Sequence, residues 1–217
     1  MSTDYKKIIS DFTKDDYTSN KVNLHIHTRY SDGKGDYRSI VSQAEKCGYK
    51  FIAITDHNTI QGHRDNSDLL HFVIPAVEFD VWYKYIFLHL LAYGIDVNAK
   101  CMEKFYAKTK SDTEKDIVRI LPKRNIKELI NAIHQSGGIA VIAHPACCWA
   151  LSMDKFISDL KDLGLDGMEI YYPYGRWRRF MKFASYEKLE KIADKYGLIK
   201  TGGTDMHEVS IKHFVLD

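Results

Sequence analysis

A unit of three parts recurs along the chain: an amphipathic helix, a glycine and a short apolar strand. In each helical segment the apolar residues recur with a period near 3.6, so one face of the helix must be buried. Each glycine stands where such a helix would end and the backbone would need a positive φ. The helices are expected within residues 40–47, 126–133, 156–163 and 189–196, and the glycines are Gly48, Gly137, Gly164 and Gly197.

The strands that follow these glycines are apolar on both faces, which is typical of parallel strands covered by helices. They comprise residues 51–54, 139–143, 167–171 and 198–201. Three further apolar stretches, at 22–27, 73–79 and 85–93, bring the number of expected strands to seven. The last two are separated by a short break, so we expect neighbouring strands with no full helix between them. Seven strands in mostly βα order predict an α/β fold with a closed or nearly closed barrel, and an open doubly wound sheet is the alternative.

Two segments fall outside this pattern. Residues 1–20 are polar and predict an N-terminal extension packed on the outside of the main domain, which spans residues 21–217. Residues 96–124 are charged and rich in lysine, and they predict a short surface insertion containing one helix. A chain of 217 residues is long enough for one domain with a substantial core.

Composition narrows the class of protein. A net charge of +2 is too small to indicate a nucleic-acid or membrane partner by itself. No apolar run reaches membrane-spanning length. The four cysteines lack the spacing of a zinc ribbon, and the first residues are polar, so we predict a cytoplasmic protein with reduced thiols and no obligatory protein partner.

Histidines gather at the ends of the expected strands. Six of the ten histidines lie there, together with several carboxylates. The six are His25, His27, His57, His89, His144 and His207. In a parallel βα barrel the C-terminal strand ends meet at one rim, where the chemistry of such folds is found. His25 and His27 also share one face of a strand, because side chains alternate along it.

This pattern predicts a site for several metal ions. Sites that mix imidazole and carboxylate suit Zn²⁺, Mn²⁺ or Fe²⁺, whereas Mg²⁺ and Ca²⁺ prefer shells made of oxygen. A cluster of such ions needs a carboxylate that bridges them and offsets their charge. Glu78, which stands among apolar neighbours, is the natural bridge.

Six sequence motifs, in this order, resemble those of the PHP family, which is named after polymerase and histidinol phosphatase. The motifs are His25-x-His27-Thr28-x-x-Ser31-Asp32-Gly33, Ile54-Thr55-Asp56-His57-Asn58-Thr59, Ile74-Pro75-Ala76-Val77-Glu78, His89, Ala143-His144-Pro145 and Gly202-Gly203-Thr204-Asp205-Met206-His207. The resemblance implies a distorted seven-stranded βα barrel that binds up to three metals and hydrolyses phosphoesters.

The resemblance also implies a set of ligands for each metal. The first metal would take His25, His27, Glu78 and Asp205; the second Glu78, His89 and His144; the third Asp32, His57 and His207. The Ser-Asp-Gly form around Asp32 resembles members that act on nucleotide 3′-phosphates and on short RNA from its 5′ end, whereas histidinol phosphatases tend to carry histidine there.

The expected reaction is hydrolysis of a phosphate ester by a metal-activated hydroxide. Asp205 is expected to receive the proton of the water, and His207, His57 or a bound water to protonate the leaving group. Glu78 would contribute as the bridging ligand. The expected substrate is small and phosphorylated, such as a nucleoside 3′,5′-bisphosphate or a short RNA end. The alternatives are a non-catalytic PHP scaffold, a histidinol-phosphate-type phosphatase and, less favoured, an amidohydrolase that also begins with HxH.

An arginine cluster follows the strand 167–171, on the rim where the metals are expected. Arg176, Arg178 and Arg179 alternate with aromatic residues, which predicts that they hold a second phosphate while a base stacks on the rings. The alternative is a solvated start of a helix. We therefore predict these arginines as substrate-binding residues.

Overall fold

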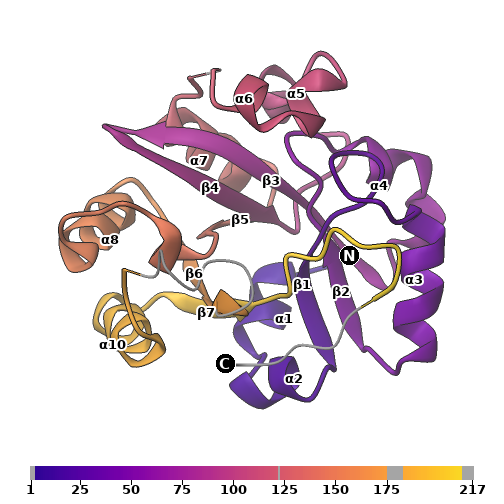
Figure 1. Cartoon of the computed structure of the whole chain (residues 1–217), viewed down its shortest axis with the longest axis horizontal. Coiled ribbons are helices and arrows are strands. Elements are labelled where there is room, and N and C mark those ends of the chain that lie inside the picture. The colour runs from indigo at the N-terminus through magenta and orange to yellow at the C-terminus, as the bar shows by residue number, and fades with distance from the viewer. Residues whose placement is uncertain (1–2, 122, 175–182, 212–217) are drawn as a thin grey trace.

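Seven strands form one sheet in which they follow each other in chain order. The computed structural model describes residues 3–121, 123–174 and 183–211. The strands are β1 (Val22–Ile26), β2 (Phe51–Ile54), β3 (Val73–Tyr83), β4 (Ile86–Tyr93), β5 (Ile139–Ile142), β6 (Gly167–Tyr171) and β7 (Ile199–Gly202). All seven stretches expected from the sequence are therefore strands (Figure 1).

The sheet is parallel except around β4. The pairs β1–β2, β2–β3, β5–β6 and β6–β7 are parallel, whereas β4 runs antiparallel to both β3 and β5. The two edges approach each other just after β7, where Met206 forms a parallel bridge to Ile26 and its carbonyl accepts the His27 N–H at 2.8 Å. The predicted α/β fold with seven strands is confirmed. The sheet is not closed, because within the described residues a bridge rather than a continuous ladder joins its edges.

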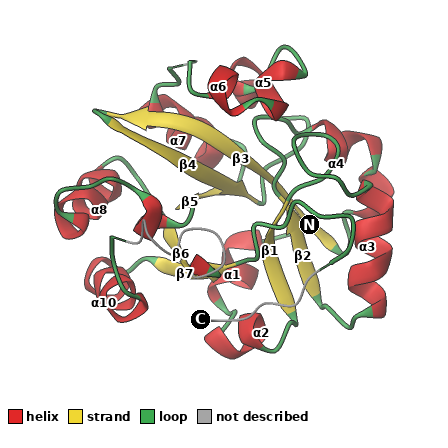
Figure 2. Ribbon diagram, viewed as in Figure 1, coloured by secondary structure: helices red, strands yellow, loops and turns green. Residues whose placement is uncertain are grey.

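Helices lie on the outside of the strands, as Figure 2 shows. The four longest are α3 (Tyr37–Lys46), α7 (Ile126–Gln135), α8 (Met153–Asp162) and α10 (Tyr186–Tyr196). Each begins at a residue whose side chain accepts a hydrogen bond from the backbone N–H three positions later: Asp36, Asn125, Ser152 and Ser185. α10 ends at Gly197, whose φ of 60° is left-handed, as expected from the sequence.

Shorter helices complete the described chain. They are α1 (Tyr5–Ser10), α2 (Lys14–Thr18), α4 (Gln61–Asp65), η1 (Ser67–Leu69), η2 (Lys100–Phe105), α5 (Ser111–Glu114), α6 (Asp116–Arg119) and η3 (Pro145–Cys147). Ile9 of α1 and Tyr17 of α2 are fully buried in the main hydrophobic core. The N-terminal segment therefore shares the core of the strands that follow it. No helix in the described ranges is long and apolar enough to cross a membrane.

The charged segment 96–124 contains η2, α5 and α6 rather than the one helix expected. Met102 and Phe105 of η2 are buried in the main core. In Figure 1, α5 and α6 lie on the same side of the molecule as the hairpin of β3 and β4. The insertion is thus anchored by apolar side chains despite its polar composition.

Candidate metal centre

The two histidines of the first strand converge on two carboxylates. His25 and His27 lie on the same face of the chain at the end of β1, and both are fully buried. The Nε2 atoms of His25 and His27 lie 3.0 and 3.1 Å from Oε2 of Glu78, and 3.5 and 3.2 Å from Oδ1 of Asp205. These four side chains offer ligand atoms that all lie within 4.8 Å of one another.

Glu78 stands at the centre of the cluster. It lies within β3 and is 1% exposed. Ring nitrogens of five histidines lie between 2.8 and 3.4 Å from its two carboxylate oxygens. They belong to His25, His27, His57, His89 and His144. A single carboxylate in this position can contact more than one cation at once.

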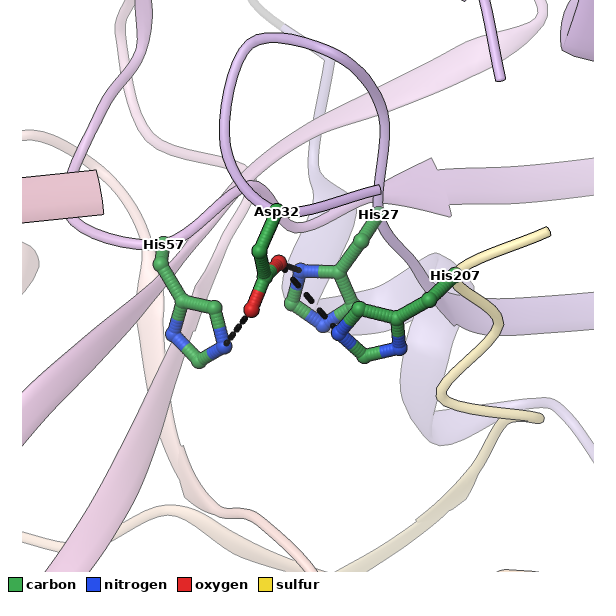
Figure 3. A group of neighbouring side chains, drawn as sticks. All are labelled: His27, Asp32, His57 and His207. Atoms are coloured by element: carbon green, nitrogen blue, oxygen red, sulfur yellow. Dashed lines mark ion pairs between the residues drawn. The ribbon is translucent and has the colours of Figure 1, made fainter. Parts of the chain in front are cut away.

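A second group gathers around Asp32, as Figure 3 shows. His207 Nε2 lies 3.2 Å from Oδ1 of Asp32, and His57 Nε2 lies 3.7 Å from its Oδ2. His27 also faces this carboxylate, with Nδ1 at 3.6 Å from Oδ1. The four residues offer ligand atoms within 4.8 Å of one another. His27 therefore stands between the group at Asp205 and the group at Asp32.

A third group consists of His57, Glu78 and His89. The sequence predicted His89 at the C-terminal end of its strand, and this prediction is wrong. It lies within β4 directly opposite Asp80 of β3, because β4 runs antiparallel to its neighbours and its first half reaches the rim. His144 lies 3.3 Å from Oε1 of Glu78 but is not part of this group.

The turn that carries Asp32 is built by a buried aspartate. Asp56 accepts hydrogen bonds from the Thr28 N–H at 2.8 Å, the Thr28 hydroxyl at 2.6 Å and the Ser31 hydroxyl at 2.7 Å. The turn is so tight that a Cβ at Gly33 would lie 2.4 Å from the carbonyl carbon of His27. The Thr, Ser and Gly of the motif are therefore explained by the need to bring Asp32 back toward His27.

Comparison with known proteins identifies the family of this chain. The PHP domain model matches residues 23–199. The chain belongs to the PHP family. A protein of unknown role from Methanocaldococcus jannaschii is 30% identical over 72% of this chain and 84% of its own length.

Two further proteins carry names that concern activity. The phosphoribosyl 1,2-cyclic phosphate 1,2-diphosphodiesterase of Eggerthella lenta is 21% identical over 85% of this chain and 93% of its own. A crystal structure of a candidate metal-dependent phosphoesterase from Bifidobacterium adolescentis superposes with a TM-score of 0.70 at 21% identity, covering 88% of this chain and 89% of that one. The structural likeness establishes a shared PHP fold.

Two buried carboxylates outside the nine expected ligands contact the ring nitrogens of the histidines that face away from Glu78. Asp80 Oδ1 lies 3.2 Å from Nε2 of His89 and 3.6 Å from Nδ1 of His57, on the sides of the rings that face away from Glu78. Glu169 Oε1 lies 2.9 Å from Nδ1 of His25. Such outer carboxylates fix the orientation and raise the basicity of metal-binding imidazoles. The sequence offered a signal for Asp80, because it is two residues from Glu78 and shares its strand face.

An arginine of the insertion also reaches the centre. Arg119 is 6% exposed, and its Nη1 donates to Oδ2 of Asp32 at 2.8 Å. Its Nε lies 3.8 Å from Oδ2 of Asp80. No periodic pattern in this lysine-rich stretch distinguishes Arg119 from the solvated cations around it. The arginines that the sequence did single out, Arg176, Arg178 and Arg179, lie outside the described residues.

Electrostatics couple the histidines to the carboxylates. Burial opposes protonation of His27, but its contacts with Asp205 and Glu78 outweigh burial and raise its pKa to about 10. The pKa of His144 is likewise raised to about 10 against the effect of burial. Burial lowers the pKa of His57 to about 3. In the protein without cations, some imidazoles therefore hold protons that a bound cation would have to displace.

The donor set fits divalent cations. Both ring nitrogens of His27 and Oε1 of Glu78 are buried and make no hydrogen bond to any described residue. Buried polar atoms normally have a partner, and a cation would supply one. The combination of imidazole nitrogens with carboxylate oxygens suits zinc, manganese and iron.

Proposed function

We propose that this protein is a phosphoesterase that uses two or three divalent transition-metal cations held around Glu78. The observation that carries the proposal is the convergence of five histidine rings on the two oxygens of this one buried carboxylate. Membership of the PHP family and the fold shared with a candidate metal-dependent phosphoesterase support the same reaction class.

Three groups of side chains would hold the cations. The first comprises His25, His27, Glu78 and Asp205; the second Glu78, His89 and His144; the third Asp32, His57 and His207. When bound, such cations lower the pKa of a water molecule and neutralise the oxygens of the phosphoryl group. We propose Zn²⁺, Mn²⁺ or Fe²⁺ because nitrogen donors are so numerous.

Two of these candidate ligands are also placed to assist proton transfer. Asp205 is kept in place by the Tyr172 hydroxyl, which donates to its Oδ2 at 2.8 Å, and we propose that it receives the proton of the attacking water. The side chain of His207 is 30% exposed, so it stands at the open side of the cluster. We propose that a bound water beside His207 donates the proton to the leaving oxygen, because the Nε2 of His207 would itself hold the third cation.

We propose phosphomonoesters as the preferred substrates, with a nucleoside 3′,5′-bisphosphate or a short RNA end as the physiological class. A monoester offers more terminal oxygens to a cation cluster than a diester does. The insertion is short, and it leaves little protein to hold a long strand. The relative from Eggerthella lenta is named for a cyclic phosphate substrate, so a cyclic diester belongs in the test.

The test is a comparison of aryl phosphomonoesters, acyclic diesters and a ribose cyclic phosphate with protein loaded with Mn²⁺ or Zn²⁺. We expect hydrolysis that chelation abolishes and that is faster for the monoester than for either diester. Asp205→Asn should lower kcat by two or more orders of magnitude. Faster turnover of a diester would overturn the monoester preference. Loaded protein that cleaves none of the esters would favour a non-catalytic PHP scaffold.

A further inference from the structure

The insertion is fastened over the metal centre by contacts with three different strand ends. The Asn58 side chain, just after β2, donates to the carbonyl of Asp112 at 3.1 Å. Trp82 Nε1 of β3 donates to the carbonyl of Ile120 at 2.9 Å. The Lys110 ammonium donates to the carbonyl of Arg29, in the loop after β1. Helices α5 and α6 are thereby held next to the loops that carry the candidate ligands.

Arg119 is the residue through which this insertion meets the cluster. Two of its nitrogens have acceptors: Nη1 donates to Asp32 at 2.8 Å and Nη2 to Asp116 at 2.6 Å. Its Nε is buried and makes no hydrogen bond within the part of the chain that the structure describes. The guanidinium therefore has a buried donor without an acceptor beside a site built for an anionic substrate. Guanidinium groups bind the oxygens of phosphate in pairs, through parallel hydrogen bonds.

The guanidinium and a cation would share the single negative charge of Asp32. Asp32 is one of the three candidate ligands of the third cation position, with His57 and His207, and its Oδ2 is the atom that Arg119 contacts. A divalent cation on this carboxylate would repel the guanidinium, because both are positive and share one anion. A phosphate group would relieve the repulsion by supplying oxygens to both.

We propose that Arg119 couples the third cation position to the substrate. When no phosphate is bound, the guanidinium holds Asp32. When substrate enters, the guanidinium moves to the phosphate oxygens, and Asp32 is left to the cation. This inference rests on the proposed phosphoesterase function. It assigns the insertion a role in substrate binding and predicts that phosphate and the third cation strengthen each other's binding. Because binding linkage is reciprocal, the factor by which phosphate strengthens cation binding must equal the factor by which the cation strengthens phosphate binding.

The experiment counts bound Mn²⁺ by electron paramagnetic resonance of the free ion, with and without phenylphosphonate, a phosphate analogue that is not hydrolysed. For the wild-type chain we expect the weakest cation to bind about 10- to 100-fold more tightly with saturating phosphonate. Arg119→Gln should bind this cation more tightly than the wild type without phosphonate, and phosphonate should then change its affinity much less, because only the direct contact between phosphonate and cation remains. Arg119→Lys keeps the charge but loses the paired donors, so it should retain a smaller linkage.

Arg64→Gln is the matched control, because Arg64 contacts the Val97 carbonyl and Glu103 of the insertion but not the cluster. It should behave like the wild type. Equal cation affinity with and without phosphonate in the wild type would overturn the inference, as would an unchanged linkage in Arg119→Gln. If the wild type cleaves aryl phosphates but shows no linkage, only the inference fails. If it neither cleaves esters nor binds phosphonate, the proposed function fails with it.

Discussion

Glu78→Gln is the substitution that most directly weakens the proposed centre. It keeps the shape of the side chain and removes one negative charge that two cations would share. The attraction between unit charges roughly 4 Å apart is about 4 kcal/mol at an effective dielectric constant near 20, and it doubles for a divalent ion. Because desolvation offsets part of this attraction, we expect a loss of about 3 kcal/mol or more per cation, which corresponds to at least about 100-fold weaker binding.

Elemental analysis after dialysis against a fixed concentration of Mn²⁺ or Zn²⁺ measures this loss. The wild type should retain two or three ions per chain, and Glu78→Gln one or none, with hydrolysis of aryl phosphate reduced in parallel. Glu45→Gln is the control, because Glu45 lies on the exposed side of α3 and its substitution removes the same charge. An unchanged ion content in Glu78→Gln would refute the assignment of Glu78 as the bridge.

Two other predictions follow from the cluster. Asp80→Asn should weaken cation binding about 10- to 100-fold, because the Asp80 carboxylate orients the rings of both His57 and His89. Titration calorimetry measures this affinity, and a wild-type value would contradict the prediction. In the metal-free protein, the pKa of His27 is raised from 6.5 to about 10. The stability that its bound proton contributes is therefore complete below about pH 6.5 and is lost as the pH rises through about 10. The free energy of unfolding should therefore fall across this window, by up to about 1.4 kcal/mol per pH unit for each such histidine. Chemical denaturation of chelator-treated protein that shows a rise instead would contradict this sign.

Much of the fold could be predicted because most of its units are local. The repeated helix, glycine and buried strand produce the parallel part of the sheet, and residues such as Gly197 adopt the expected left-handed conformation. The direction of β4 could not be predicted, since an apolar strand after a short break pairs in either direction until its partners are known. β3 also runs on to Tyr83, beyond the expected end near Phe79, because its last residues pair with β4.

The candidate site was predictable where ligands stand at strand ends and follow a motif. The nine expected ligand residues converge in the structure, although their binding of metal stays a prediction. The sequence indicates no role for Glu169, because a strand carboxylate alone does not reveal that it lies beside an imidazole. Asp80 could have been predicted from its place two residues after Glu78 on the same strand face. Arg119 was missed for a different reason. Its burial depends on how a charged insertion packs against three segments distant in the sequence, which no local pattern encodes.

Anomalous diffraction from crystals of the protein grown with Mn²⁺ or Zn²⁺ tests the central claim most directly. The account predicts two or three anomalous peaks, with at least two of them at ligand distance, about 2.0–2.2 Å, from oxygens of Glu78. Imidazole nitrogens of the surrounding histidines should complete their coordination. A fully loaded crystal with no peak beside Glu78, or with a single ion bound elsewhere, would contradict the account.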